Sequence, residues 1–276
     1  MQISNLIKTF EFELQRKNYR KQSTDNYVSC VTKFLYHFKD KDSVKHINED
    51  DIKQFLYTFK ESNTQRGYHS AIKAFYKYVC NQPNKFKWIE YAKRNRKLPI
   101  VLSEYEVQLI FNQCENLKHK AILSLLYSCG LRVGEVVALK IADVDSSRMI
   151  INILNAKGGK DRIVPMHNEL LNVLRNYFKE FRPVEYLFNG QKKEQYTIKS
   201  IQELVKTYGE KAGIKKRIYP HLFRHSSFTN MLEGGVELSI IQKCAGHSTI
   251  KTTQLYTHIS STLLNRVYNP LQNISL

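Results

Sequence analysis

Hydrophobic residues in the first third of the chain recur with helical spacing. Four runs place apolar residues three or four positions apart, and Lys, Arg, Asn and Gln are dense between them. The runs carry Ile3, Leu6, Ile7, Phe10 and Leu14; Tyr27, Val28, Val31, Phe34, Leu35 and Phe38; Ile52, Phe55, Leu56 and Phe59; and Tyr68, Ile72, Phe75 and Val79. Amphipathic helices bury their apolar stripes against one another. The pattern therefore predicts a small helical bundle over residues 1–84.

Helix signals return after residue 100. The sequence "SEYE" is a capping box in which Ser103 begins a helix and Glu106 reaches back to it. A second apolar helix is expected to end at Gly130, because glycine tolerates the left-handed backbone that closes a helix. Pro220 is expected in the first turn of a further helix.

Two β-branched runs interrupt these helices. "RMIINIL" at 148–154 and "DRIVPM" at 161–166 flank "NAKGGK", which predicts a β-hairpin with a glycine-rich turn. The predicted fold class is therefore mainly α with a small antiparallel β-sheet (α+β), and residues 100–276 form the second domain.

A basic segment at 85–99, "KFKWIEYAKRNRKLP", separates the two domains and predicts a linker. Its basic residues either remain solvated or follow a nucleic-acid backbone, and the sequence favours neither interpretation. They are Lys85, Lys87, Lys93, Arg94, Arg96 and Lys97.

The charge balance favours a polyanionic partner. The chain has 43 Lys and Arg against 25 Asp and Glu, a formal net charge of +18, which attracts phosphates by steering and counterion release. The alternative is a basic protein that is merely soluble. Five scattered cysteines without a C-x-x-C pair favour reduced thiols over disulfides or a zinc site. With no signal-peptide core and no apolar stretch of about 18 residues, we expect a soluble, cytoplasmic protein with no membrane partner.

One histidine stands out in "YPHLFRHSSF". Among nine histidines, only His221 has an arginine three positions later, at Arg224. On a helix these two side chains share a face, where they could grip an oxyanion and transfer a proton. The alternative is a structural histidine beside a surface arginine.

Two further segments carry candidate groups. In "GLRVGEVV", Arg132 and Glu135 form either a surface ion pair or a guanidinium that the glutamate orients into a cleft. In "AKGGKDR", Lys157 is either solvated or able to protonate a leaving oxygen, and Lys160 is its rival.

The candidates, in chain order, resemble those of the tyrosine recombinases, the phage integrase family that includes the Xer-type enzymes. The matching segments are "GLRVGEVVALKIADVD", "AKGGKDRIVPM" and "PHLFRHSSFTNMLEGGVELSIIQKCAGHSTIKTTQLYTH", within a similarity that covers 99–260. Leu222 and Phe223 depart from the acid and leucine of many relatives, and "KCAGH" replaces a leucine-rich approach. These departures concern packing more than chemistry.

The resemblance implies a nucleophile and its proton carriers. Tyr256 would attack a DNA phosphate and form a 3′-phosphotyrosine, with a free 5′-hydroxyl on the other end. Lys157 would protonate the leaving 5′-oxygen, and His221 would assist proton transfer at the tyrosine. A free phenol has a pKa of about 10 and needs such help at neutral pH.

The resemblance also implies groups that hold the phosphate. Arg132 and Arg224 would clamp its non-bridging oxygens, His247 would hydrogen-bond to it, and Glu135 would support the arginines. Two arginines and a lysine supply the positive charge that phosphoryl transfer needs. We therefore expect neither a metal ion nor another cofactor, and the chain has no phosphate-binding P-loop motif.

Partner and assembly follow from the same resemblance. Double-stranded DNA would be bound by the core-binding (SAM-like) domain 1–84, the linker 85–99 and the catalytic domain 100–276, with Lys160 and Arg162 as further contacts. A tail helix in "ISSTLLNRVYNPL" (259–271) would join a dimer on each site into a tetramer. The expected outcome is integration or excision of a mobile element or phage. The alternatives are Xer-type resolution of chromosome or plasmid dimers, and a catalytically silent DNA-binding regulator.

Overall fold

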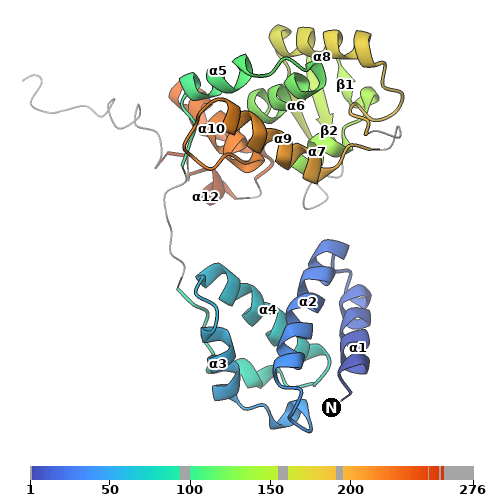
Figure 1. The fold of residues 1–276 in the computed structure, drawn as a ribbon, viewed down its shortest axis with the longest axis vertical. Helices are drawn as coiled ribbons and strands as arrows, with labels where there is room; N and C mark the ends of the chain where they lie inside the picture. Colours follow the sequence, from blue (N-terminus) through green and yellow to red (C-terminus); the bar gives the residue numbers. More distant parts are fainter. Residues whose placement is uncertain are drawn as a thin grey trace, which may run out of the picture. The chain divides into compact units, whose positions relative to one another are not determined.

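The chain forms two compact units, Met1–Lys97 and Leu98–Leu276, which we describe separately (Figure 1). The computed structural model describes residues 2–93, 100–154, 161–190, 195–247, 249–254 and 256–257. The predicted tail helix at 259–271 lies outside these residues.

The N-terminal unit is a bundle with the helices that the sequence predicts. They are α1 (Ile3–Arg16), α2 (Lys21–His37), α3 (Glu49–Tyr57) and α4 (Ser62–Tyr78), with short 3₁₀ turns η1 (Val44–His46) and η2 (Pro83–Phe86) (Figure 1). Helix α2 packs against both α1 and α4.

Aromatic rings fill the centre of this bundle. Phe10, Phe34 and Phe75 are completely buried. The Phe10 and Phe75 rings meet edge to face at 5.6 Å, and the Phe34 and Phe55 rings do so at 5.3 Å. Each edge-to-face pair adds about 0.5–1.5 kcal/mol of stabilisation beyond that of burying the rings. The buried residues of the bundle form a hydrophobic core of their own.

Part of the predicted linker packs against this bundle. Phe86 and Ile89 are buried in its core, and a ring nitrogen of His69 lies 2.8 Å from the Ile89 carbonyl oxygen. Arg66 donates a hydrogen bond of 2.8 Å to the carbonyl of Ala92. The apolar residues within the basic run therefore attach residues 85–93 to the bundle, which the basic pattern alone does not indicate.

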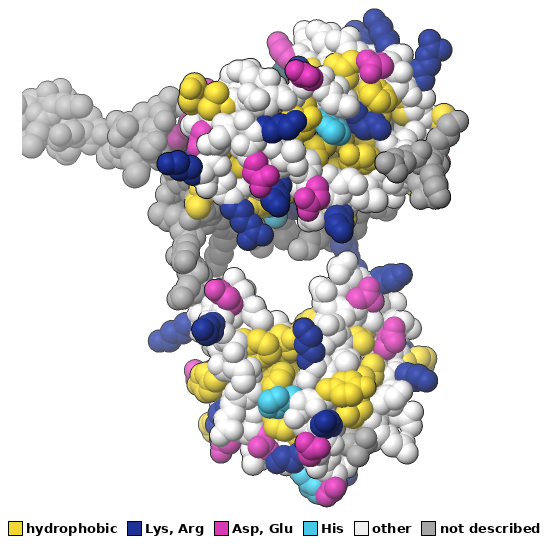
Figure 2. All heavy atoms as spheres, in the orientation of Figure 1, with side chains coloured by type: hydrophobic (Ala, Val, Ile, Leu, Met, Phe, Trp, Pro, Cys, Tyr) yellow, Lys and Arg dark blue, Asp and Glu magenta, His cyan; other side chains and the backbone are white. Residues whose placement is uncertain are grey.

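The predicted basic contacts in this segment differ in exposure. Lys87 and Lys93 are exposed, whereas Lys85 is half-buried and lies 5.3 Å over the Tyr76 ring. Arg94, Arg96 and Lys97 lie outside the described residues. Figure 2 shows Lys and Arg interspersed with Asp and Glu on the visible face of each unit.

The C-terminal unit begins with the predicted capping box. The Ser103 hydroxyl accepts a hydrogen bond from the Glu106 backbone N–H at 3.2 Å, and Glu106 Oε2 accepts one from the Ser103 N–H at 2.9 Å. This box opens α5 (Glu104–Asn112). Helix α6 (Leu117–Ser128) ends before Gly130, whose φ of +56° confirms the predicted stop.

A three-stranded antiparallel sheet contains the predicted hairpin. The order is β1–β2–β3, from β1 (Val144–Asp145), β2 (Ile150–Ile153) and β3 (Arg162–Pro165). Strand β1 was not predicted, because two residues are too few to show alternation. The hairpin turn at 155–160 lies outside the described residues. The predicted α+β class is confirmed.

The remaining described helices complete the unit, and the first four of them pack against α6, whose residues 121–126 are all buried. They are α7 (Val133–Ala138), α8 (Asn168–Phe181), α9 (Ile198–Lys211), α10 (Pro220–Glu233), α11 (Leu238–Ala245) and α12 (Ile250–Thr253), with the turn η3 (Ile141–Asp143) (Figure 1). Pro220 stands in the first turn of α10, as predicted. In the described parts of the chain, no helix is long and apolar enough to cross a membrane.

Candidate active site

Five of the six residues predicted to carry the chemistry belong to one neighbourhood of the C-terminal unit. Arg132 precedes α7, His221 and Arg224 lie on α10, His247 follows α11, and Tyr256 follows α12. The sixth, Lys157, and its rival Lys160 lie outside the described residues.

Arg224 is the most deeply placed of these groups. It is only 1% exposed, because it projects from the face of α10 that turns toward the unit's interior. One guanidinium nitrogen, Nη1, donates to the carbonyl of Gly130, and the other, Nη2, donates to the carbonyl of Ala245 at 2.5 Å. Its guanidinium carbon lies 4.8 Å from the centre of the Phe228 ring. Carbonyl oxygens orient this cation without neutralising it.

Arg132 is held by the local geometry of a helix start. Its backbone N–H donates to Glu135 Oε2 at 2.8 Å, as in a capping box, and its Nη1 donates to Oε1 at 2.9 Å. Its Nη2 lies 3.3 Å from the Ala245 carbonyl oxygen that also receives Arg224. Glu135, three positions later, and the Ala245 carbonyl therefore hold the arginine from two sides. Its side chain stays 24% exposed.

The sequence predicts that Arg162 contacts DNA, but in the structure its side chain is buried within the C-terminal unit. Its side chain is 7% exposed, and its two terminal nitrogens donate to both oxygens of Glu135 at 2.8 and 2.7 Å. Its Nε donates to the Cys244 carbonyl at 2.7 Å. Arg162 shares a strand face with the buried Val164, and this alternation was the signal for an inward side chain.

Two of these charged groups have shifted pKa values, and both remain ionised at neutral pH. Burial alone would raise the pKa of Glu135, but hydrogen bonds and charge from Arg162, then from Arg132, hold it at about 2. Burial, then the nearby charge of Arg132, lowers the pKa of Arg224 to about 10. Three guanidiniums against one carboxylate leave a positive surplus, which suits an anionic ligand.

His247 is kept neutral beside these arginines. Burial, followed by the charge of Arg224, lowers its pKa to about 4. Its Nε2 lies 3.4 Å from Arg224 Nη2, and its Nδ1 lies 3.0 Å from the Thr253 hydroxyl. A guanidinium can only donate, so Nε2 faces it as the acceptor and Nδ1 carries the hydrogen. Thr253 was not predicted from the sequence.

Tyr256 lies beside Phe228 and His247. It is 1% exposed, and its ring centre lies 5.5 Å from that of Phe228 and 6.2 Å from that of His247. Burial raises the pKa of its phenol, while Arg224 and Arg132 oppose the rise. The phenol therefore carries its proton at neutral pH and must lose it to act as a nucleophile.

A pair of stacked histidines adjoins the tyrosine. The His221 and His225 rings are nearly parallel, with centres 5.0 Å apart, and the His225 ring lies 5.8 Å from that of Tyr256. The Nδ1 of His225 is buried and has no hydrogen-bond partner among the described residues. Burial and the neighbouring His221 lower its pKa to about 4. Sequence reasoning missed His225, although it stands one helical turn after His221.

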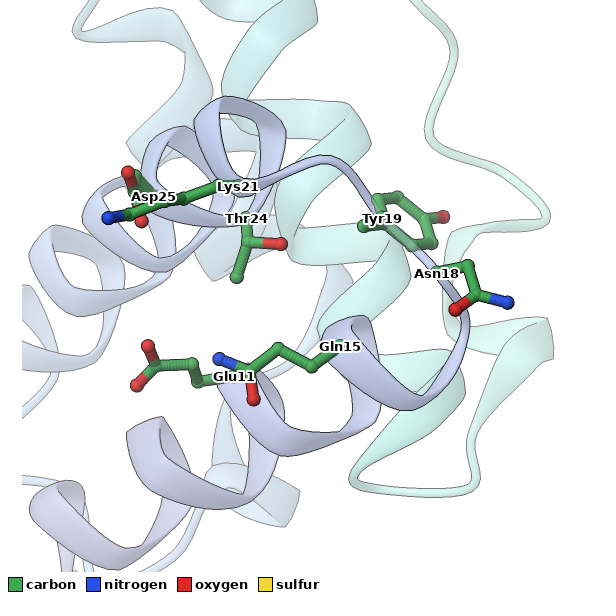
Figure 3. Close-up of a pocket in the computed structure, with 7 residues that line it drawn as sticks. All are labelled: Glu11, Gln15, Asn18, Tyr19, Lys21, Thr24 and Asp25. Carbon is green, nitrogen blue, oxygen red and sulfur yellow. The ribbon is translucent and has the colours of Figure 1, made fainter. Parts of the chain in front are cut away.

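Other regions offer less chemistry. Within the described ranges, no group of three or more His, Cys, Asp or Glu is arranged to hold a metal ion. The N-terminal unit has a polar hollow between α1 and α2, drawn in Figure 3. It is lined by Glu11, Gln15, Asn18, Tyr19, Lys21, Thr24 and Asp25. Its mixed charges do not form a phosphate site.

Comparison with known proteins assigns the chain to a family. Residues 100–262 match the phage integrase family, and residues 6–85 match the N-terminal SAM-like domain of phage integrases. The chain is 31% identical to tyrosine recombinase XerD of Oceanobacillus iheyensis, over 94% of this chain and 95% of that protein. It is 33% identical to tyrosine recombinase XerA of Pyrococcus horikoshii, over 94% and 90% of the two chains.

A solved structure agrees with this assignment at the level of the fold. A lambda integrase tetramer bound to a Holliday junction superposes with a TM-score of 0.77 at 15% identity, over 92% of this chain and 76% of that one. The chain therefore belongs to the phage integrase family and is a tyrosine recombinase, an enzyme that cuts and rejoins DNA through a phosphotyrosine intermediate.

Proposed function

We propose that this recombinase acts on a specific double-stranded DNA site, with Tyr256 as the nucleophile. One observation carries the proposal: two guanidiniums, of Arg132 and Arg224, meet at one carbonyl beside the buried Tyr256 ring. Fixed donors of this kind are most effective where negative charge develops in a transition state.

The proposed step balances without an external energy source. The Tyr256 oxygen forms a bond to phosphorus, and the bond from phosphorus to the 5′-oxygen breaks. Arg132 and Arg224 bind the non-bridging oxygens. His247 binds one of them as a donor once the hydrogen has moved from its Nδ1 to its Nε2, and this contact replaces the one from Arg224. Lys157 donates a proton to the departing 5′-oxygen, a role that rests on its position in the sequence "AKGGKDR" and on the resemblance to the family. The reverse step rejoins a strand, because the phosphotyrosine conserves the phosphodiester bond.

The phenol proton leaves toward the stacked histidines. His221 is the acceptor that we propose, since its ring stacks on His225, which in turn adjoins Tyr256. The raised pKa of the tyrosine makes this transfer necessary at neutral pH. Glu135 keeps Arg132 oriented while the charge on the phosphate grows.

DNA contacts and assembly extend the proposal. The exposed Lys87 and Lys93 are suited to a DNA backbone, as are Lys85, Arg94, Arg96, Lys97 and Lys160 by their charge. The lambda integrase was solved as a tetramer on a Holliday junction, which supports a dimer on each site and a tetramer during strand exchange. The tail at 259–271 would provide the contact between protomers.

The biological outcome that we propose is integration or excision of a mobile element or phage, which is compatible with the phage integrase match to both parts of the chain. A second candidate is resolution of chromosome or plasmid dimers, which the Xer names of the two relatives favour. The DNA sequences that the enzyme cuts distinguish the two. Integration predicts sites at the ends of an inserted element, and dimer resolution predicts one site present once per replicon.

A covalent-trapping experiment tests the chemistry. The probe is a pool of nicked duplexes with a randomised central segment, because the nick lets the released strand diffuse away and leaves the protein attached. The full chain is incubated with the pool and denatured, and the attached strands are sequenced. We expect a consensus, and a protein joined to the 3′ end of the cut strand.

Two tyrosine variants make the result specific. Tyr256→Phe keeps the buried ring and should abolish the adduct while DNA binding is retained. Tyr219→Phe changes a 42% exposed tyrosine at the start of α10 and should react like the unmodified chain. An adduct that persists in Tyr256→Phe would identify a different nucleophile, and loss of DNA binding in that variant would mean that its failure is not chemical.

A further inference from the structure

We infer that Arg162 is a positioning residue of the active site, which fixes Arg132 through Glu135 and joins both to the end of α11. This inference rests on the proposed function of the site. It replaces the DNA contact that the sequence suggests for Arg162, and it concerns a residue that would not itself touch the phosphate.

Two arginines donate hydrogen bonds to the carboxylate of Glu135. Its carboxylate is 8% exposed and receives both terminal nitrogens of Arg162, at 2.8 and 2.7 Å. The same two oxygens receive the backbone N–H and the Nη1 of Arg132, at 2.8 and 2.9 Å. A bidentate arginine fixes the plane of a carboxylate. The orientation of Glu135, and through it of Arg132, therefore depends on Arg162.

Arg162 also contacts the C-terminal end of α11. The carbonyls of Cys244 and Ala245 lie in its last turn, where helix carbonyls lack partners and carry partial negative charge. Arg162 donates to Cys244 at 2.7 Å, whereas Arg132 and Arg224 converge on Ala245 at 3.3 and 2.5 Å. Three guanidiniums thus share one helix end.

The glycine after this helix shows how closely Arg162 fits. Gly246 has a φ of +62°, and a Cβ there would lie 3.0 Å from the Arg162 Cδ. The Arg162 side chain occupies the space over this glycine, directly before His247. One residue of β3 therefore contacts the two segments that carry Arg132 and His247.

The burial of Arg162 argues against a DNA contact. All three of its side-chain nitrogens donate within the protein, and 7% of the side chain is exposed. A phosphate contact would require these bonds to break. The two roles predict different measurements, because a phosphate contact governs affinity and its salt dependence, whereas positioning governs the rate of the bound complex.

The experiment uses the full chain with Arg162→Lys and Arg162→Met, and with Arg175→Met on the exposed face of α8 as the matched control. The DNA is the consensus duplex recovered from the randomised pool. The measurements are the single-turnover rate of adduct formation at saturating DNA, the dissociation constant at several salt concentrations, and the melting temperature.

We expect both Arg162 variants to form the adduct about 10- to 100-fold more slowly, because displacing a reactive group by about 1 Å has effects of this size. Lysine keeps the charge but cannot form the two-pronged contact. DNA affinity and its salt slope should match those of the unmodified chain, and Arg175→Met should be unchanged in every measurement.

A double variant separates positioning from a general loss of structure. If Arg162 acts through Glu135, then adding Arg162→Met to Glu135→Gln should slow the reaction by less than about threefold, since residues in one network are not additive. Independent losses that multiply would overturn the inference. So would an unchanged rate at saturation with a salt slope reduced by about one, which is the result for a phosphate contact.

The two proposals can fail separately. If the unmodified chain forms no adduct with the pool, the proposed function is wrong. If it forms the adduct and both Arg162 variants react at the same rate, only the role of Arg162 is wrong. Should Arg162→Met fail to fold, Arg162→Lys and its combination with Glu135→Gln give the same comparison.

Discussion

The two units of this recombinase bury different kinds of side chain at their centres. In the N-terminal unit the described interior is apolar and aromatic, and its buried polar residues are Thr24 and His69. The C-terminal unit has a larger aliphatic core, but beside it lie the buried guanidinium of Arg224 and the pair of Glu135 with Arg162. In the N-terminal unit, the buried side chains stabilise the fold. In the C-terminal unit, buried groups also orient charged side chains.

The difference reflects the physical cost of burying ions. A buried charge is destabilising unless partners satisfy it, and each one in the C-terminal unit has either a carboxylate or backbone carbonyls around it. Apolar side chains at these positions would stabilise the fold without the free-energy cost of removing charges from water. A cationic centre that already exists before DNA binds avoids reorganisation during the reaction.

The largest effect is expected at Arg224. Replacing Arg224 with lysine keeps a charge but loses the planar fork that contacts the carbonyls of Gly130 and Ala245. We expect adduct formation at saturating DNA to fall about 10³-fold, the effect of removing one oriented donor from a transition state. Arg217→Lys, at an exposed arginine before α10, is the control. A reaction at the normal rate would show that charge alone suffices there.

The next largest effect is a loss of stability in the N-terminal unit. Phe75 is completely buried and meets Phe10 edge to face, so Phe75→Ala should destabilise the bundle by about 3–5 kcal/mol. Hydrogen exchange should show faster opening in peptides from α1 to α4. Phe12→Ala, at a 62% exposed ring, should change little. Equal acceleration in peptides of the C-terminal unit would contradict the view that the bundle has its own core.

The sequence predicts the helices of both units better than it predicts the charged centre. The helical runs, the Ser103 capping box, the Gly130 stop and the Pro220 start are all local signals, and the structure confirms them. Local rules succeed here because each depends on residues within one or two helical turns.

The site depends on contacts between distant segments. Arg162 meets Glu135, 27 positions earlier, and the Cys244 carbonyl, 82 positions later. The alternation in "KDRIVPM" indicates that Arg162 faces inward with Val164, but the local pattern does not identify the distant groups that its guanidinium contacts. His225 and Thr253 were also missed, although His221 and His247, the residues they contact, stand only four and six positions earlier. The resemblance to a family indicated the candidate catalytic groups and Glu135 beside Arg132, but it did not indicate Arg162 as a partner of Glu135.

The smallest effect concerns Glu135, and it separates the two units by their response to acid. Folding lowers the pKa of this carboxyl from 4.5 to about 2. A lowered pKa in the folded state stabilises the protein above the unfolded value, and this stabilisation disappears as the pH falls through the folded value. The contribution should therefore be complete at neutral pH, at most about 3 kcal/mol, and be lost between about pH 4.5 and pH 2.

Glu135→Gln removes this titration. The variant should be less stable than the unmodified chain at neutral pH, and the two unfolding free energies should converge as the pH approaches 2. Asp51 offers a matched comparison, because it occupies the same third helical position in α3, caps Asn48 at 2.8 Å, and has a lowered pKa, yet its side chain is 22% exposed. Asp51→Asn should show a smaller dependence on acid, because solvent screens an exposed carboxylate and its partners. If both variants lose the same unfolding free energy at neutral pH, then capping geometry alone accounts for the effect of Glu135. In that case the arginines around Glu135 add nothing to the stability of the protein.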